Sequence, residues 1–361
     1  MKKEELTLEE KIGQMLIIGV NEKKVTNKTI EMIEKYKVGG FILYKDNYQN
    51  YEEMVNLVNK LKKTNSNNKV PLFISIDQEG GRVYRMPPEI VRIKNAKAFA
   101  ETKNIEIVGE SGTVTGKMLK QTGINMNYSP VLDIGRYKDD DAIGNRSYGK
   151  DENEVSIYGI EVMKKLQEQK VISVVKHFPG HGASKLDSHF QIPVIKKKIE
   201  TLEKEDIKPF KIAIENGADT IMVGHLILED VDKKYPASLS KTIIQDYLRN
   251  KYKFGGLIIS DDIKMLAIRL HYSLRKTIIN AINAGDNIIL AGYSYGKIKK
   301  IINIVKKEIE NGKISIDKID DSVEKILKIK EKYNITDARV NGAKIENIND
   351  EINKLNEKVL K

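Results

Sequence analysis

The chain has 361 residues, of which 40% are hydrophobic and 31% are charged, and it contains no cysteine. This length and composition allow a substantial buried core, and the lack of cysteine excludes disulfides, thiolate metal sites and a cysteine nucleophile. The net charge of +11 comes from lysines interleaved with acidic residues. Because no basic run is spaced with aromatic residues, a nucleic-acid partner is not expected.

The first residues of the chain predict its location. Met1 to Glu5 are mostly charged and lead into an amphipathic stretch. They lack the apolar segment and cleavage site of a secretory signal, and no apolar run approaches the roughly 18 residues of a membrane helix. We therefore expect a cytoplasmic protein without a membrane segment. An exported chain numbered after signal removal would have the same pattern.

Eight short apolar runs rich in β-branched residues recur along the chain, and each precedes a segment with helical periodicity. The expected strands are Met15–Val20, Gly40–Tyr44, Leu72–Ile76, Asn125–Val131, Val171–Val175, Thr220–Val223, Gly256–Ile259 and Asn287–Leu290. They are apolar on both faces, which is typical of a buried parallel sheet. Eight strand–helix units over about 300 residues favour a (β/α)8 barrel, possibly imperfect, over a doubly wound sheet.

A further helix is expected after the eighth unit. Its apolar residues follow alternating steps of three and four and are Ile345, Ile348, Ile352, Leu355 and Val359. This spacing gives a narrow seam, which we expect to pack outside the barrel, with a partner helix as the alternative. The chain is therefore divided into a catalytic barrel, residues 1–335, and a helical tail, residues 336–361.

Polar side chains follow five of the expected strands and should converge on one mouth of the barrel. They are Asp77, Asp133, Lys176 with His177, His225 and Asp261. From its position alone, Asp261 is as well suited to cap the following helix as to face the mouth. Asp262 is expected to point the other way along an extended chain.

The segment from Lys176 to His189 contains three of the five histidines. Its proline and glycines predict a loop that follows the fifth strand. Asp187 and His189 are two residues apart, so the carboxylate can orient the imidazole for proton transfer near neutral pH. An isolated pair of this kind is more often a surface hydrogen bond. We expect the loop to move and to bring His189 to the mouth.

Two chemistries fit such a mouth. Metal-dependent hydrolysis of amides or phosphoesters would use the histidines with an aspartate, but Pro179 and Gly180 prevent the helix that would pair His177 with His181. Glycoside hydrolysis by double displacement needs an aspartate nucleophile and a separate acid/base, and it makes use of Asp187 and His189. A sugar-binding protein without catalysis is a third possibility.

These motifs resemble glycoside hydrolase family 3, in its β-N-acetylglucosaminidase (β-hexosaminidase) branch and single-domain type. The matching segments are Ile76–Val83, Ser129–Ile134, Ala142–Tyr148, Lys176–Gly182, Asp187–His189, Met222–His225, Pro236–Ser238 and Ile259–Asp262. The likeness covers residues 8–335 in the family's order. It implies a retaining exo-hydrolase of terminal β-linked N-acetylglucosamine, acting on peptidoglycan-derived fragments without a metal or other cofactor.

The resemblance also implies roles for individual residues. Asp261 would be the nucleophile, His189 the acid/base and Asp187 its orienting partner. The positions that match the family's sugar subsite are Asp77, Arg85, Arg146, Lys176, His177 and His225. A neutral imidazole does not repel an anion, so phosphate could replace water in the second step, and phosphorolysis stays a hypothesis.

Two further expectations concern the shape of the site. The chain has no tryptophan, so Tyr44, Tyr128 and Phe178 are the candidates for stacking on a sugar, in a pocket for one terminal residue. Gly80 and Gly81 are expected to let the backbone approach a ligand closely.

Overall fold

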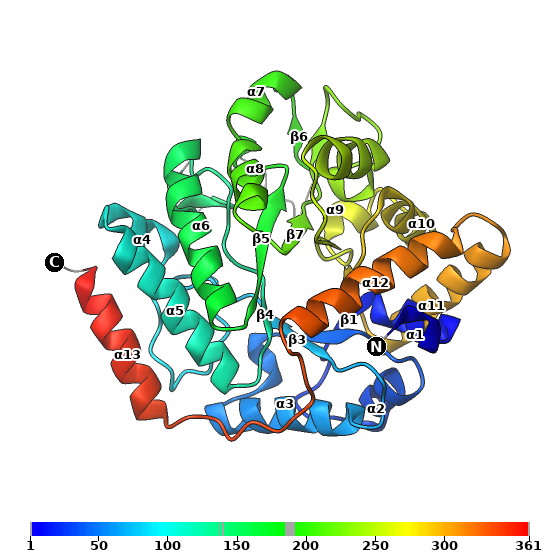
Figure 1. Cartoon of the computed structure of the whole chain (residues 1–361), viewed down its shortest axis with the longest axis horizontal. Coiled ribbons are helices and arrows are strands. Elements are labelled where there is room, and N and C mark those ends of the chain that lie inside the picture. The colour runs from blue at the N-terminus through cyan, green and yellow to red at the C-terminus, as the bar shows by residue number, and fades with distance from the viewer. Residues whose placement is uncertain (1, 137, 139–140, 185–191, 360–361) are drawn as a thin grey trace.

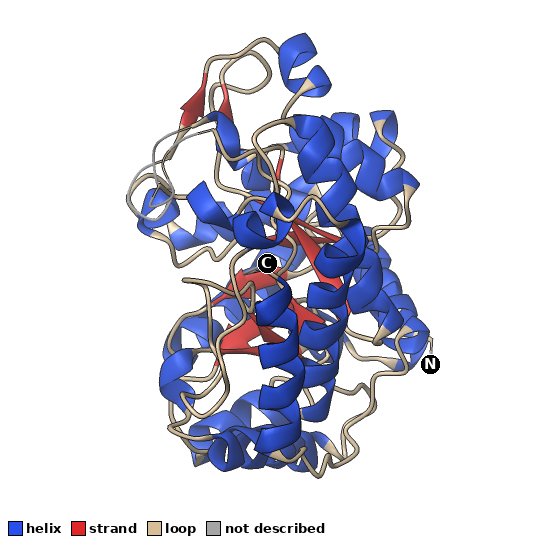
Figure 2. Ribbon diagram, turned by 90° about the vertical axis from the view of Figure 1, so that its left-hand side faces the viewer, coloured by secondary structure: helices blue, strands red, loops and turns tan. Residues whose placement is uncertain are grey.

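The computed structural model describes residues 2–136, 138, 141–184 and 192–359. Eight parallel strands form a nearly closed barrel surrounded by helices (Figures 1 and 2). In chain order they are β1 Leu16–Gly19, β2 Gly40–Leu43, β3 Phe73–Ile76, β4 Met126–Asn127, β5 Ile172–Phe178, β7 Thr220–Val223, β9 Leu257–Ser260 and β10 Ile289–Ala291. The predicted barrel fold is confirmed.

The order of the strands around the barrel is β10-β1-β2-β3-β4-β5-β7-β9. The two ends of this series meet at a single parallel bridge between Ile259 and Ile288, which brings the sheet close to closure. Every residue of the eight strands is buried. This burial on both faces is the reason that the strands are continuous apolar runs in the sequence.

Two strands differ from the prediction. Only Met126 and Asn127 of the expected fourth strand pair regularly with β3 and β5. Pro130 has no amide hydrogen to donate, so the ladder stops before it. The fifth strand, in contrast, continues to Phe178, and Lys176 and His177 therefore belong to β5 rather than to a loop.

Helices cover the outside of the barrel. The longer ones are α1 Leu8–Gln14, α2 Asn27–Glu34, α3 Tyr51–Asn65, α5 Ile105–Gln121, α6 Glu152–Glu168, α8 Lys208–Glu215, a π-helix at Thr242–Lys251, α10 Leu274–Ala284, α11 Tyr295–Glu310 and α12 Ile316–Lys332. Shorter ones are α4 Ala96–Glu101, α7 Ile199–Lys204 and α9 Leu266–Arg269. Side-chain caps fix many of their first residues, as Asn50, Asn104 and Asp151 do for α3, α5 and α6.

A two-stranded sheet that was not predicted lies outside the barrel. It pairs β6, Val194–Ile195, with β8, Ile227–Leu228. Figure 1 shows β6 beside α7 at the edge of the molecule. Strands of two residues are too short to leave a periodic pattern in the sequence.

The last helix, α13 Ile345–Lys358, lies beside α5 (Figure 1). Ile348, Ile352 and Leu355 are buried, as the apolar seam predicts. The connection that precedes α13 is held by α3, because the backbone amides of Val340 and Ala343 donate to Asn59 and Tyr51.

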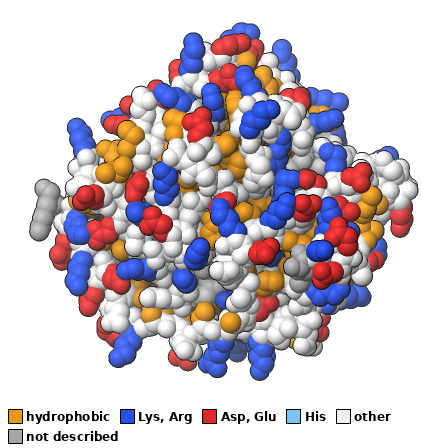
Figure 3. Space-filling view, viewed as in Figure 1, with side chains coloured by type: hydrophobic (Ala, Val, Ile, Leu, Met, Phe, Trp, Pro, Cys, Tyr) orange, Lys and Arg blue, Asp and Glu red, His pale blue; other side chains and the backbone are white. Residues whose placement is uncertain are grey.

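The surface has mixed charge. Lysine and arginine side chains are scattered among acidic ones over the face seen in Figure 3. Among the described residues, no helix has both the length and the apolar character needed to cross a bilayer.

Candidate active site

A pocket of about 610 Å³ opens at the carboxyl ends of the strands. Its polar and charged lining residues are Tyr44, Asp77, Glu79, Arg85, Arg146, Lys176, His177, His181, Asp261, Asp262, Lys264 and Arg269. Of the predicted site residues, six line this pocket together: Asp77, Arg85, Arg146, Lys176, His177 and Asp261. Asp187 and His189 lie outside the described residues, as does the loop motion predicted for them.

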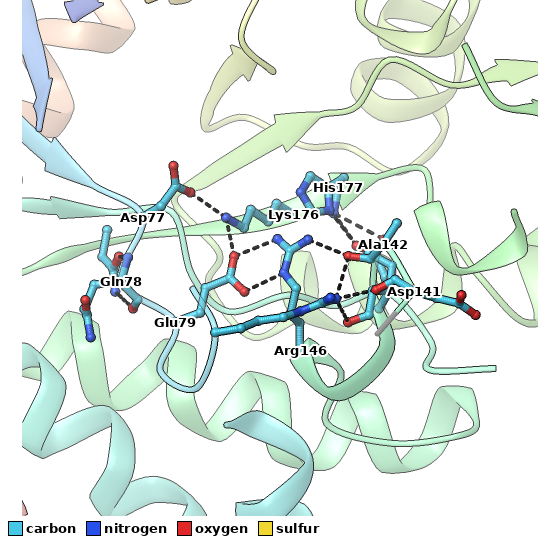
Figure 4. A network of polar contacts seen from close by, with 12 residues as sticks. Asp77, Gln78, Glu79, Asp141, Ala142, Arg146, Lys176 and His177 are labelled. Atoms are coloured by element: carbon cyan, nitrogen blue, oxygen red, sulfur yellow. Dashed lines mark hydrogen bonds and ion pairs between the residues drawn. The ribbon is translucent and has the colours of Figure 1, made fainter. Parts of the chain in front are cut away.

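The floor of the pocket contains a network of alternating charges (Figure 4). Lys176 is almost completely buried and lies 2.7 Å from both Asp77 Oδ1 and Glu79 Oε1. Arg146 donates two hydrogen bonds of 2.7 Å to the two carboxylate oxygens of Glu79. It also donates to the carbonyl of Ala142 at 2.9 Å. Two anions and two cations are thereby fixed next to one another.

The network keeps these groups charged. Burial alone would raise the pKa of Glu79, but Arg146 and Lys176 outweigh it and hold that pKa well below its usual range. Burial alone would lower the pKa of Lys176, but Asp77 and Glu79 outweigh it and raise that pKa. Both residues therefore stay ionised at neutral pH.

Glu79 was given no role from the sequence, although it occurs in the matched segment Ile76–Val83. Its side chain is only 5% exposed and it is the acid that joins Arg146 to Lys176. An acid three residues after the end of a barrel strand and just before two glycines was a usable signal, because loops at this end of the strands face the mouth.

Asp133 was predicted to face the mouth of the barrel, but it is not among the lining residues of the pocket. It is fully buried and accepts hydrogen bonds from the backbone amides of His177 and His181, the latter at 2.7 Å. Its carboxylate also lies 2.6 Å from His177 Nδ1. Burial would raise the pKa of Asp133, but His177 and His181 outweigh it and lower that pKa. Asp133 therefore orients His177. Because Nδ1 is bonded to Asp133, Nε2 is the ring nitrogen left to meet a ligand in the pocket.

His181 is also enclosed beside Asp133. Burial is the main cause that lowers the pKa of its imidazole to about 4, against the opposing effect of Asp133. His181 is therefore neutral at pH 7. A neutral ring next to His177 adds no positive charge to this side of the pocket.

Asp261 and Asp262 both line the pocket, so the prediction that Asp262 points away is wrong. Strand β9 ends at Ser260, and the alternation of side chains does not continue beyond it. Asp262 Oδ1 accepts from the amides of Lys264 and Gly292, at 2.9 and 3.0 Å. Asp261 does not cap a helix, since α9 begins at Leu266.

The two carboxylates differ in their surroundings. Asp261 Oδ1 accepts from the Asp262 amide at 2.8 Å, and the Asp261 amide donates to the carbonyl of Val223. Burial is the main cause that raises the pKa of Asp262 to about 6, and the charge of Asp261 adds to it. Gly292 leaves space for this arrangement, because a Cβ there would lie 2.5 Å from both Asp262 Oδ2 and the Tyr44 hydroxyl.

His225 is not among the lining residues of the pocket, although it contacts the backbone of Asp262, which is one of them. It is fully buried, with Nδ1 at 2.7 Å from Ser238 Oγ and Nε2 at 3.1 Å from the carbonyl of Asp262. Because a carbonyl only accepts, Nε2 carries the hydrogen and Nδ1 accepts from the serine. His225 therefore supports the backbone that carries Asp261 and Asp262.

Two of the three candidates for sugar stacking are wrong. Tyr44 lines the pocket. Tyr128 is fully buried with its hydroxyl on Ser75, and Phe178 packs in the core against Phe210. Tyr128 lies inside the barrel near the pocket carboxylates but below its surface, and Phe178 packs away from the pocket, two placements that the sequence does not distinguish from a residue on the pocket wall.

Gly80 and Gly81 were expected to let the backbone approach a ligand, but in the structure they allow a close approach to another part of the chain. Both have positive φ, and a Cβ on either would collide with the chain at Lys94 and Asn95. The close approach is therefore between two parts of the same connection. Among the described residues, no three histidine, aspartate or glutamate side chains are grouped so that they could hold a metal ion.

The chain is similar to known glycoside hydrolases over most of its length. The profile of the glycosyl hydrolase family 3 N-terminal domain matches residues 7–329. A β-hexosaminidase of Nitrosomonas eutropha is 32% identical over 259 residues, which are 70% of this chain and 73% of that protein. A β-hexosaminidase of Photobacterium profundum is 33% identical over 274 residues, 75% of this chain and 80% of that protein.

A solved structure has the same fold. The glycoside hydrolase family 3 β-N-acetylglucosaminidase from Paenibacillus sp. str. FPU-7 superposes with a TM-score of 0.92 at 31% identity. The match covers 98% of this chain and 69% of that one. These similarities confirm the resemblance seen in the motifs. The chain therefore belongs to glycoside hydrolase family 3, in its β-N-acetylglucosaminidase (β-hexosaminidase) branch, and is a glycoside hydrolase.

Proposed function

We propose that this enzyme is a retaining exo-β-N-acetylglucosaminidase with Asp261 as its nucleophile and His189 as its acid/base. The observation that carries the proposal is the position of Asp261, whose side chain lines the same pocket as Asp77, Lys176 and Arg146. Double displacement requires a carboxylate beside groups that hold the sugar, so that the anomeric carbon meets the nucleophile in one orientation.

The reaction has two balanced steps. In the first, the Asp261 carboxylate bonds to the anomeric carbon, the bond to the leaving oxygen breaks, and protonated His189 gives its proton to that oxygen. In the second, neutral His189 takes a proton from water, whose oxygen attacks the anomeric carbon and releases Asp261. A reference pKa near 6.5 suits an imidazole to both steps. From the family resemblance, Asp187 orients the ring and stabilises its charged form, and no metal or other cofactor takes part.

The network on the floor of the pocket is suited to bind sugar hydroxyls. Asp77 is 27% exposed there and offers an acceptor, while Lys176 and Arg146 are donors already fixed by Glu79. Arg85 lines the same pocket, and Asp133 holds His177 in orientation. Groups that are ordered before the sugar arrives lose little conformational entropy on binding. His225 acts through the Asp262 backbone.

A label on the nucleophile tests this proposal. The enzyme is incubated with a fluorinated N-acetylglucosaminide that has an activated leaving group, and the labelled peptide is found by mass spectrometry. We expect the adduct on Asp261, with no labelling of Asp261→Asn and normal labelling of Asp262→Asn as the matched control. Normal labelling of Asp261→Asn, or an adduct on another residue, contradicts the assignment.

For the natural substrate we propose peptidoglycan-derived fragments, following the family resemblance. Lys264 and Arg269 support this choice, because both line the pocket and are exposed, so they can attract an acidic leaving group. We expect kcat/KM to be higher for N-acetylglucosaminyl muropeptides than for chitobiose, and the advantage to shrink in Arg269→Ala. Equal or higher kcat/KM for chitobiose contradicts the proposed substrate.

A further inference from the structure

Helix α13 lies beyond the family match, which ends at residue 329. It carries two half-buried asparagines, Asn349 and Asn356, that bond to the backbone of the segment 89–94. Asn349 donates through Nδ2 to the carbonyl of Glu89 and accepts through Oδ1 from the amide of Val91, both at 2.8 Å. Asn356 makes the same pair with the carbonyl of Arg92 and the amide of Lys94, at 3.0 and 3.2 Å.

The two pairs are regularly spaced, both along the helix and along the segment. Asn349 and Asn356 are seven positions apart on the helix, which is about 10.5 Å along its axis and nearly two full turns. The bonded backbone groups on the segment are three positions apart, from the carbonyl of Glu89 to that of Arg92 and from the amide of Val91 to that of Lys94. The two side chains therefore contact equivalent positions of the segment. Such a repeat fixes the register of the segment as well as its place.

The helix that presents these asparagines is itself anchored. Ile348, Ile352 and Leu355 are buried against the rest of the protein. Glu351 pairs with Lys117 of α5 at 3.3 Å, and Lys358 pairs with Glu110 of α5 at 2.5 Å. Because α13 is held by these contacts, it can act as a fixed support for the segment 89–94.

The same segment is bonded to the part of the chain that enters the pocket. The hydroxyl of Tyr84 lies 2.8 Å from the carbonyl of Val91 and 3.1 Å from that of Ile90. The amide of Gly81 donates to the carbonyl of Ile93 at 2.8 Å. Tyr84 precedes Arg85, and Gly81 lies in the turn that follows Glu79. The Tyr84 bonds thus connect the segment to the chain neighbour of Arg85, which lines the pocket, and the Gly81 bond fixes the turn that follows Glu79.

We propose that Asn349 and Asn356 are positioning residues that set the place of Arg85 in the pocket, acting through the segment 89–94 and Tyr84. The inference rests on the proposed role of Arg85 in binding the sugar. Neither asparagine lines the pocket. They act through backbone contacts, so their effect is on affinity for the sugar rather than on the bond-breaking groups.

The test compares two double variants on the same helix. Asn349→Ala with Asn356→Ala removes both backbone pairs, while Asn347→Ala with Asn353→Ala changes two exposed asparagines as the matched control. With an aryl N-acetyl-β-D-glucosaminide as substrate, we expect the first to raise KM by about five- to tenfold with kcat within about twofold. The control should leave both constants unchanged. Melting curves establish that each variant is folded at the assay temperature.

The route through Arg85 is tested by repeating the pair in the Arg85→Ala background. We expect little further rise in KM there, because the two changes act on one contact. An unchanged KM for Asn349→Ala with Asn356→Ala, or a full additional rise in KM in the Arg85→Ala background, overturns the inference. If Arg85→Ala alone leaves KM unchanged, the proposed role of Arg85 is wrong, and the inference loses its basis. Each single asparagine variant leaves one pair intact and should move KM in the same direction by less.

Discussion

At the mouth of the barrel, two adjacent carboxylates meet different surroundings. Asp262 is held by the amides of Lys264 and Gly292 and faces the Tyr44 hydroxyl across Gly292. Its pKa is raised to about 6, by burial first and by the charge of Asp261 second. The charged form of Asp262 is thus costly in the folded protein.

This difference predicts how stability depends on pH. Between the unfolded pKa near 3.9 and the folded pKa of about 6, folded Asp262 keeps a proton that the unfolded chain has lost. Its contribution is therefore present below pH 4 and is lost as the pH rises through 6. We compare the free energy of unfolding of wild type with that of Asp262→Asn. From pH 4 to pH 7.5 we expect the wild-type value to fall, relative to the variant, by up to about 2 kcal/mol. This figure is smaller than the full pKa difference implies because water in the pocket screens the charge.

Urea denaturation at the two pH values measures this difference. Asp246→Asn, at an exposed position, is the control and should show no such change with pH. If the gap between wild type and Asp262→Asn is the same at both pH values, the environment assigned to Asp262 is incorrect.

Much of the pocket could be predicted at the level of single residues. Asp77 and Asp261 follow buried strands and Lys176 lies near the end of one, and parallel strands bring their carboxyl ends to one edge. Glu79 was missed because the sequence does not show which acid lies between two cations. Asp262 was misplaced because side-chain alternation holds only while the strand continues, and the strand ends before it.

At the scale of elements, the barrel strands were predictable because burial on both faces makes each one a continuous apolar run. The extension of β5 was not, since Lys176 and His177 are polar residues in a buried strand. Their polar groups are satisfied there by Asp77, Glu79 and Asp133, which come from distant parts of the chain. The pair β6 and β8 was missed because its pairing is tertiary and its strands have two residues each.

The tail helix was predicted in part from the sequence: its position was, and its polar contacts were not. Its apolar seam predicts a helix that packs on the barrel, and α13 lies along α5. The seam does not show that Asn349 and Asn356 bond the backbone of the segment 89–94. Polar residues of an exposed helix are usually solvated, so only the tertiary structure distinguishes the ones that hold a loop.

Over the whole molecule, the end of the barrel opposite the pocket is held by a buried lysine. Lys330 of α12 donates to Gln14 Oε1 at 2.8 Å and to the carbonyls of Gly39 and Pro71 at 3.1 and 2.6 Å. Gly39 and Pro71 lie just before β2 and β3. One ammonium therefore joins α1 and α12 to the start of two neighbouring strands.

Replacing this lysine should reduce stability without affecting catalysis. Lys330→Met leaves three acceptors, two of them buried, without their donor, and we expect a loss of about 2–4 kcal/mol in the free energy of unfolding. Lys328→Met, at an exposed position of the same helix, is the control and should change little. Urea denaturation and steady-state kinetics at 25 °C measure the two effects. Reduced kcat/KM with unchanged stability contradicts the assignment.

The separation between Lys330 at one end of the barrel and the charged pocket at the other has a practical consequence for engineering. Changes that improve heat tolerance can be sought around the start of β2 and β3, while selectivity is altered at the opposite rim. Because the two regions lie at opposite ends of the barrel strands, improvements found separately should combine by simple addition.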